Sequence, residues 1–359
     1  MAYLPLSTAN LPDPAIDPAQ GSSPSDYFNT VLWTGNGAST IDITGVGFQP
    51  DFVWAKARSR VDGHGLFDAV RGTNLWLQSN TTGAETTFGG NFGLLSFDSD
   101  GYTMGNGSSV NASGATYVGW NWKANGSGVS NTDGSITSTV SANTTSGFSV
   151  VKYDGSGTAA TVGHGLNQAP EMIFCKRLDR SGDDWKVYAE AIGGGTHQLT
   201  LNSTAAASTN SAQWNDTDAT STVFSIGTSA ATNGTNQIAY CFHSVEGFSK
   251  FVSYTGNGSA DGPFVYTGFR PAFVMIRKTS GDRWFMGDST RSPTNTSDGI
   301  RLVDASGVDA EFANSPAEDY DMLSNGFKIN TSDNGVNTSG STYIYMAFAE
   351  NPFKYSNAR

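Results

Sequence analysis

Cysteine is scarce in this sequence, because the 359 residues include only two, Cys175 and Cys241. Both lie inside apolar segments with the character of β-strands, where a free thiol acts as a small buried hydrophobic side chain. A disulfide between them would require that their strands are neighbours in one sheet. We expect two buried free thiols.

Long apolar runs are also missing. No segment approaches the roughly 18 apolar residues of a membrane-spanning helix, and Met1 is followed by neither a basic segment nor an apolar signal core. We therefore expect no membrane insertion and no cleaved signal peptide. In such a chain the Asn-x-Ser/Thr triplets are turn sequences and not glycosylation sites.

Basic residues are few as well, with 20 Lys and Arg against 32 Asp and Glu and a net charge of −12. Binding to a nucleic-acid backbone requires clustered Lys and Arg side chains, and none are clustered here. The charge balance excludes a nucleic-acid partner and indicates a soluble protein.

The sequence is rich in glycine, with 43 residues, and in Ser, Thr and Asn. Many short segments with the character of strands are spaced by these turn-forming residues, and no window has a sustained apolar helical stripe. This composition is typical of all-β sandwiches or barrels.

One segment occurs three times, at residues 47–56, 166–176 and 268–278. Each copy is a proline-marked turn followed by about five apolar residues and a cation, which predicts a buried strand. Similar aromatic and leucine-rich strands surround each copy in the same order. Pro50, Pro170 and Pro271 place the copies about 120 and about 100 residues apart, which is the size of a domain.

The sequence therefore predicts an all-β protein of three tandem β-sandwich repeats, jelly-roll-like and about 100–120 residues each, after an extended proline-rich N-terminal arm. The expected boundaries are 1–25 for the arm, 26–124 for repeat 1, 125–142 for a Gly/Ser/Asn linker, 143–246 for repeat 2 and 247–359 for repeat 3. Residues 135–140 alternate enough to form a short edge strand. Repeats 2 and 3 should pack rigidly, with repeat 1 attached more loosely. The sequence leaves open whether the three form separate sandwiches or one pseudo-threefold body, and the tight junction at 245–248 favours a compact arrangement.

The arm has five of the twelve prolines and almost no charge. Such a segment favours extended polyproline conformations and is excluded from a central sheet. Its Leu4, Leu6, Leu11 and Ile16 suit an arm laid along a neighbouring subunit, and the alternative is a loose tail.

For each possible metal or phosphate site in the sequence, a purely structural role explains the residues better. Asp98, Asp100 and Gly101 form half of a calcium-loop pattern but lack its further ligands, so a hairpin turn is expected. The glycine-rich segments 34–37 and 193–196 precede no helix that could hold a phosphate. Both should be turns.

Catalytic patterns are equally incomplete. The sequence has no Gly-x-Ser-x-Gly elbow, and none of the histidines recurs in all three repeats; they are His64, His164, His197 and His243. Two acidic clusters could in principle cleave glycosides, but we expect solvated loop charge at Asp179, Asp183 and Asp184 and at Glu318, Asp319 and Asp321. Asp68 with Arg71 and Asp288 with Arg291 suggest ion pairs that hold turns, and repeat 2 has Ala189 and Ile192 there. Most aromatic residues should be core.

Four motifs resemble a known family. They stand at 145–151 (TSGFSVV), 254–258 (YTGNG), 268–274 (GFRPAFV) and 341–354 (STYIYMAFAENPFK). These are similar to uncharacterised tandem-repeat β modules of virion and tail-associated structural proteins of marine bacteriophages, including those of cyanobacteria. The resemblance extends from residue 26 to nearly the end of the chain and transfers no catalytic residues.

The resemblance implies a non-enzymatic virion structural protein, assembled in the host bacterial cytoplasm: a tail fibre, spike or surface decoration subunit. We expect no cofactor, metal or catalytic site, and no residue is assigned to a ligand. The expected partners are the chain itself, most simply as a homotrimer, other virion proteins through residues 1–25, and host surface glycans. The alternatives are a virion-associated polysaccharide depolymerase, or a capsid decoration or head fibre protein with no receptor role.

Overall fold

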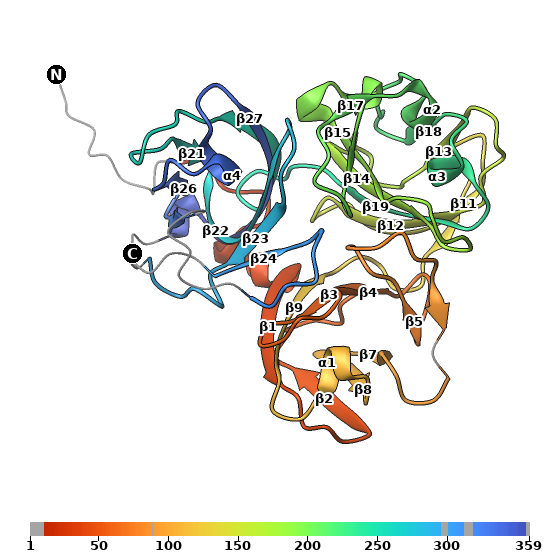
Figure 1. Cartoon of the computed structure of the whole chain (residues 1–359), viewed down its shortest axis with the longest axis horizontal. Helices are drawn as coiled ribbons and strands as arrows, with labels where there is room; N and C mark the ends of the chain where they lie inside the picture. The colour runs from red at the N-terminus through yellow and green to blue at the C-terminus, as the bar shows by residue number, and fades with distance from the viewer. Residues whose placement is uncertain (1–10, 88, 296–300, 312–318, 357–359) are drawn as a thin grey trace.

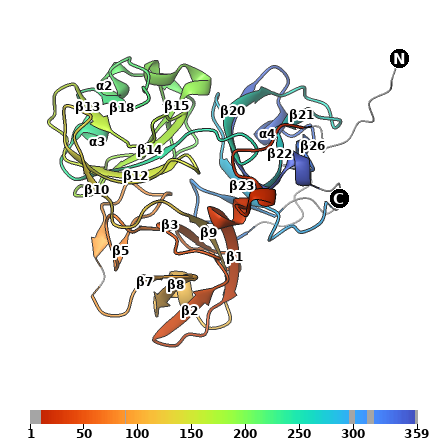
Figure 2. The same ribbon diagram turned by 180° about the vertical axis from the view of Figure 1, so that it is seen from behind.

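The computed structural model describes residues 11–87, 89–295, 301–311 and 319–356 of the chain. This part is mostly antiparallel β-sheet, and its few α-helices are single turns, so the all-β prediction is confirmed. Figure 1 shows three lobes that follow one another along the sequence, and Figure 2 shows them from behind. We call them unit 1 (26–124), unit 2 (125–246) and unit 3 (247–356).

The elements of unit 1 are β1 (Phe28–Thr34), β2 (Thr40–Thr44), β3 (Phe52–Ala57), β4 (Gly65–Asp68), β5 (Leu75–Trp76), β6 (Thr86–Thr87), β7 (Leu94–Asp98), β8 (Gly101–Gly105), α1 (Ser108–Asn111) and β9 (Thr116–Trp122). Those of unit 2 are β10 (Val129–Asn131), β11 (Ser138–Asn143), β12 (Phe148–Tyr153), β13 (Ala160–Gly163), β14 (Met172–Arg177), β15 (Lys186–Ala189), η4 (Glu190–Ile192), η5 (Gly194–Thr196), β16 (His197–Thr200), β17 (Ser208–Thr209), α2 (Ser211–Trp214), β18 (Val223–Ile226), α3 (Ala230–Asn233) and β19 (Gln237–Phe242). Those of unit 3 are β20 (Ser249–Thr255), β21 (Phe264–Tyr266), β22 (Phe269–Lys278), β23 (Trp284–Asp288), β24 (Leu302–Asp304), β25 (Tyr320–Leu323), β26 (Gly326–Ile329), α4 (Asn334–Asn337), β27 (Thr342–Pro352) and η6 (Phe353–Tyr355).

The larger sheets of the three units share one strand order. Their common strands are β1-β9-β3-β4, β12-β19-β14-β15 and β20-β27-β22-β23. Smaller sheets, β2-β8-β7, β13-β18 and β21-β26-β25, complete the units. In unit 1 the two sheets enclose a core that includes Val53 of β3 and Tyr102 of β8. Each unit is therefore a two-layer β-sandwich, and the matching registers relate positions on the common strands of one unit to positions in the others.

The proline-marked strands are buried on both faces, which explains their unbroken apolar sequences. Every residue of β3 is buried. Val53 and Ala55 point into the core of unit 1, whereas Phe52 and Trp54 belong to a second core that the three units share. A strand that is covered on both faces has no position for polar alternation.

The shared core is centred on three equivalent aromatic rings. Trp122, Phe242 and Phe348 come from the closing strands β9, β19 and β27, and each ring contacts the other two, with centroids 6.4, 5.6 and 6.2 Å apart. The three units therefore form one body with internal pseudo-threefold symmetry. The looser attachment predicted for unit 1 is wrong, because Trp122 of unit 1 lies at this centre.

The linker predicted for residues 125–142 is wrong. Residues 129–131 and 138–143 form β10 and β11, which extend the larger sheet of unit 2. β11 pairs with β12 along its whole length, and Val140 is buried. The polar Ser and Thr residues of this segment alternate with that apolar side chain, so strand pairing outweighs its linker-like composition. The short strand expected near residues 135–140 lies here.

The prediction of an arm along a neighbouring subunit is wrong for residues 11–25, because they pack on their own chain; residues 1–10 lie outside the described residues. The segment includes η2 (Pro18–Gln20) and η3 (Pro24–Asp26). Ile16 is fully buried in the shared core. Ala15 N–H donates to Glu246 O, and Lys354 pairs with Asp13. The segment thus bridges unit 3 and the start of unit 1.

Candidate functional site

The histidines do not form a catalytic group. His64 and His164 are completely buried, and burial lowers the pKa of His64 to about 3 and that of His164 to about 4. The His197 ring is bonded to the neighbouring Thr196, and the His243 ring to the neighbouring carbonyl of Ser244. Each ring therefore has a local structural role.

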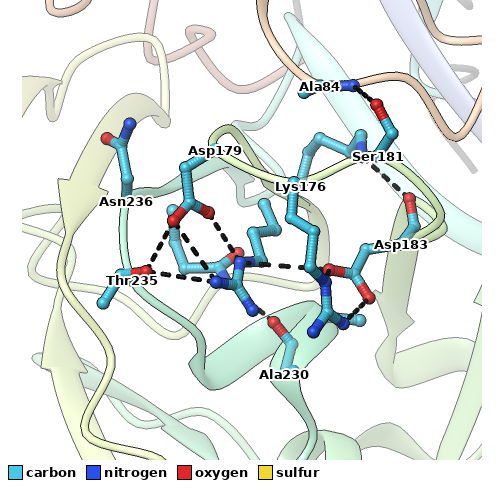
Figure 3. Close-up of polar contacts among 12 residues, drawn as sticks. Ala84, Lys176, Asp179, Ser181, Asp183, Ala230, Thr235 and Asn236 are labelled. Atoms are coloured by element: carbon cyan, nitrogen blue, oxygen red, sulfur yellow. Dashed lines mark hydrogen bonds and ion pairs between the residues drawn. The ribbon is translucent and has the colours of Figure 1, made fainter.

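The acidic loop of unit 2 is a set of ion pairs (Figure 3). Arg177 donates to Asp179 at 2.6 Å, and Arg180 donates to Asp183 at 2.8 and 2.5 Å. The hydrogen bond from Arg177 holds the pKa of Asp179 down at about 2. A general acid for glycoside cleavage needs the opposite shift, so Asp179 is a poor candidate for this role. The ion pair with Arg180 gives Asp183 a structural role.

The remaining acidic candidates are also dispersed. Asp98 pairs with Gly101 across the predicted hairpin turn between β7 and β8, and Asp100 accepts backbone N–H groups of the neighbouring loop. Asp321 lies on β25 just after Asp319, and Glu318 lies outside the described residues. Within the residues that the structure describes, no group of three His, Cys, Asp or Glu side chains could hold a metal ion.

The two cysteines lie on the paired strands β14 and β19, and both are free and completely buried. Burial raises the pKa of Cys175 to about 12 and also raises that of Cys241. The prediction of buried free thiols is confirmed. Because a thiolate is the reactive form, neither residue is a candidate nucleophile.

Polar side chains also gather where two units meet, and we call these contacts junctions 1–2, 2–3 and 3–1. The three junctions share one backbone hydrogen bond. It joins Glu85 N–H to Leu178 O (2.7 Å) at junction 1–2, Ala207 N–H to Thr279 O (2.7 Å) at junction 2–3, and Glu311 N–H to Arg58 O (2.8 Å) at junction 3–1. Each unit therefore contacts the next in the same way around the pseudo-threefold axis.

A ring N–H of each unit also donates to a carbonyl of the preceding unit. The bonds are Trp185 Nε1 to Gln78 O at 2.8 Å, Trp284 Nε1 to Thr200 O at 3.0 Å and His64 Nε2 to Asp304 O at 2.9 Å. Trp54 Nε1 donates to His64 Nδ1, which places the proton of the neutral imidazole on Nε2. His64 thus does what an indole does at the other two junctions.

Junction 1–2 contains a buried ionic network. Arg71 donates to Asp68 and, at 2.9 Å, to Glu85. Tyr240 of unit 2 donates its hydroxyl to Asp68 at 2.8 Å. The side chains of Asp68 and Arg71 are completely buried, so the network is strongly coupled and joins the two units.

Junction 3–1 contains the same network with one change of donor. Arg291 pairs with Asp288 at 2.5 Å and with Glu311 at 3.4 Å. Trp120 of unit 1 donates its Nε1 proton to Asp288 at 3.1 Å. Trp120 and Tyr240 occupy equivalent positions on β9 and β19, and each bonds to the aspartate of the preceding unit.

Junction 2–3 has lost all four members of the network together. Strand register places Ala189, Ile192, Ala207 and Met346 at the equivalent positions, and all four belong to the shared apolar core or pack against it. Replacing both partners of a buried polar pair by apolar groups is nearly neutral, whereas removing one partner is costly. The ion pairs expected at two turns are confirmed, and unit 2 has an apolar version of the same contact.

A buried cation ends each proline-marked strand beside these junctions, at Lys56, Lys176 and Arg277. Lys176 donates to Asp183 O at 2.8 Å, and Arg277 donates across junction 2–3 to Ala205 O at 2.5 Å. Burial lowers the pKa of Lys56 and of Lys176 to about 8.

These amines should make stability depend on pH. An unfolded lysine titrates near pH 10.4, so between about pH 8 and 10 each of these amines binds more protons in the unfolded chain than in the folded one. Its own contribution to the free energy of unfolding therefore rises with pH. The buried thiols act in the opposite direction. We therefore expect the difference in unfolding free energy between the wild type and Lys56→Met to change by about 1 kcal/mol per pH unit in this window. Urea titrations from pH 7 to 10 measure it, and parallel curves would contradict the assignment.

Two sets of structural residues have no match among the sequence predictions. Asp51 accepts the N–H groups of Ala124 and Gly126, at 2.7 and 3.1 Å, and Glu171 accepts that of Ser244. Both carboxylates hold the chain segment that leads to the next unit. Unit 3 has Ala272 at this position. The three aligned copies in the sequence contain this information. An acidic residue comes directly after the proline in units 1 and 2, which each lead into another unit, whereas unit 3 has an alanine there.

The second set is a buried asparagine at the end of a short helix in each unit: Asn111, Asn233 and Asn337. Their side-chain oxygens accept backbone N–H groups of the glycine turns that follow β1, β12 and β20. These bonds explain why the turn at 34–37 recurs without binding a phosphate.

None of the helices in the described part of the chain is long and apolar enough to cross a membrane.

Comparison with known proteins gives a family but no activity. A family model described as a domain of unknown function, DUF7483, matches residues 23–352. No curated protein matches the chain.

Proposed function

The chain belongs to the DUF7483 family, and we propose that this member is a non-enzymatic structural protein of a bacteriophage virion, a tail fibre, spike or surface decoration subunit. The motif resemblance at 254–258, 268–274 and 341–354 supports the class of protein. The family description adds no activity that competes with this role.

The network of junctions is the observation that supports a structural role most directly. Three sandwich units share one aromatic core, and each donates a ring N–H to the preceding unit. The buried polar groups at the junctions bond to one another. Such a body resists separation of its units, which is what a particle component requires.

We further propose that the purified chain is a monomer of 37.8 kDa, in place of the homotrimer that the sequence favoured. A cyclic trimer buries one face of each subunit around an axis. Here the three units already bury those faces within one chain, at Trp122, Phe242 and Phe348. Light scattering measures the mass, and a stable mass near three times 37.8 kDa would restore the trimer.

Residues 11–25 pack on unit 3, so we propose that virion partners contact the folded body and not a free arm. The test is mass spectrometry and immunogold microscopy on gradient-purified particles of the phage whose genome encodes the chain. We expect peptides of the chain and surface label on particles. Release of reducing ends from host polysaccharide by the purified chain would instead support a depolymerase.

A further inference from the structure

Junction 2–3 differs from junction 3–1 at the surface. Junction 2–3 contains a groove of about 480 Å³, within the usual range for ligand sites. Its lining residues come from both units: Ala191, Ile192, His197, Ala206 and Ala207 of unit 2 with Thr279, Ser280 and Thr342 of unit 3.

At junction 3–1, the equivalent space is filled by charge. Glu311 is bonded there by Arg58 at 2.8 Å, by Arg291 at 3.4 Å and by Arg301 at 3.1 Å. Three arginine side chains and one carboxylate thus close that junction.

Strand register relates each member of this cluster to a residue of the groove. Glu311 corresponds to Ala207, Arg58 to Thr279, Arg291 to Ile192 and Arg301 to His197. None of these four groove residues is Asp, Glu, Lys or Arg, and all four line the groove. The groove therefore lies at the positions where junction 3–1 has its charged cluster.

The lining indicates the chemistry of an occupant. None of its residues is Asp, Glu, Lys or Arg, although the chain has a net charge of −12. The side chains of Ser280 and Thr342 offer hydroxyl groups beside small apolar surfaces, and His197 offers the Nε2 side of its imidazole. The hydroxyl of Thr279 already donates to Thr342 O at 3.0 Å and can only accept a further hydrogen bond. An ionic ligand would find no counter-charge there.

The backbone of the groove is already paired, which disfavours an added peptide strand. Ala207 N–H donates to Thr279 O, and Thr279 N–H donates to Thr342 O. Peptide recognition by strand addition needs free main-chain groups at this position. The polar side chains that face a ligand are then those of Ser280, Thr342 and His197, which suits a polyhydroxylated molecule.

We propose that the groove at junction 2–3 binds a neutral oligosaccharide. A chain of sugar units in this groove would place its hydroxyls against Ser280, Thr342 and His197 and its C–H faces against the alanines and Ile192. Arg277 fixes one wall by donating to Ala205 O. Because particle proteins occur in many copies, weak sites can act together through avidity. The inference deepens the proposed function, since it gives a surface protein its ligand class.

The test is calorimetry with the full chain and three neutral probes, maltohexaose, cellohexaose and chitohexaose, with tri-galacturonate as a charged probe. We expect binding of at least one neutral probe. The double variant Ala207→Glu/Thr279→Arg reproduces the Arg58–Glu311 pair inside the groove, and should weaken binding at least tenfold. Ser280→Ala with His197→Ala removes polar groups without adding bulk and should also weaken it.

The matched control is Phe264→Ser/Tyr266→Ser, which removes the exposed aromatic pair of β21, 45% and 53% exposed. We expect its affinity to equal that of the wild type. Binding that is lost in this control but persists in the groove variants would place the sugar on β21 and overturn the assignment. Absence of binding by all neutral probes, or binding of the charged probe alone, would overturn it too. Because this test uses purified chain and the particle test does not, either can fail alone.

Discussion

Replacing Asp68 by alanine should lower the free energy of unfolding by about 3–5 kcal/mol, which is the usual cost of removing one member of a buried ion pair. Glu85, at 2.9 Å, would be the remaining counter-charge of Arg71. Arg71 would keep its charge in a site where both side chains are completely buried. Tyr240 would lose the acceptor of its hydroxyl at the same time. Guanidinium unfolding followed by tryptophan fluorescence measures the loss.

The chain itself supplies the matched rescue. Junction 2–3 accommodates Ala189, Ile192, Ala207 and Met346 where junction 1–2 has the ionic network. The quadruple variant Asp68→Ala, Arg71→Ile, Glu85→Ala and Tyr240→Met copies that version, so we expect it to recover to within about 2 kcal/mol of the wild type. A quadruple variant as unstable as the single one would show that the apolar version depends on other features of its own junction.

The comparison of these junctions also shows what the sequence could predict. The repeated Asp-x-x-Arg spacing of Asp68 with Arg71 was visible along the chain, and local ion pairs follow from local spacing. The bond from Tyr240 to Asp68 joins residues 172 positions apart, so it depends on how two sandwiches meet. No periodicity within one repeat contains that information.

The same distinction explains the errors in organisation. Alternation and apolar content predicted the strands, because burial on a sheet face is a local pattern. Ile16 lies in a proline-rich segment and fills the shared core only because the start of the chain returns to unit 3. Residues 125–142 resemble a linker in composition, yet β12 offers an edge on which β11 forms. In both cases the partner of the segment is supplied by tertiary structure.

The groove at junction 2–3 was also beyond prediction from single residues. Ala207 and Thr279 are ordinary surface residues in isolation. They become informative only beside Glu311 and Arg58, their equivalents at another junction. In a chain with internal repeats, equivalent residues of the repeats can therefore be compared with one another. A position at which one repeat differs from the others is a position to test.

Replacing Trp122 by alanine should cost about 3–5 kcal/mol, the range for removing a large aromatic side chain from a packed core. Its ring contacts Phe28 and Phe52 of unit 1, and it meets Phe242 and Phe348 at the pseudo-threefold centre. A cavity there withdraws contacts from all three units at once. Calorimetry should therefore show one transition at a lower temperature, and not the early melting of unit 1 alone.

Trp122→Phe is the control, because units 2 and 3 have Phe242 and Phe348 at the same position. Trp122 Nε1 is buried without a hydrogen-bond partner among the described residues, so the substitution removes an unsatisfied donor together with part of the ring. The two effects oppose each other, and we expect a net change below about 1.5 kcal/mol. A large loss in the phenylalanine variant, or separate transitions in the alanine variant, would mean that the three units do not depend on one centre. If units 1, 2 and 3 unfold in one calorimetric transition, the chain of three repeats folds as one structure.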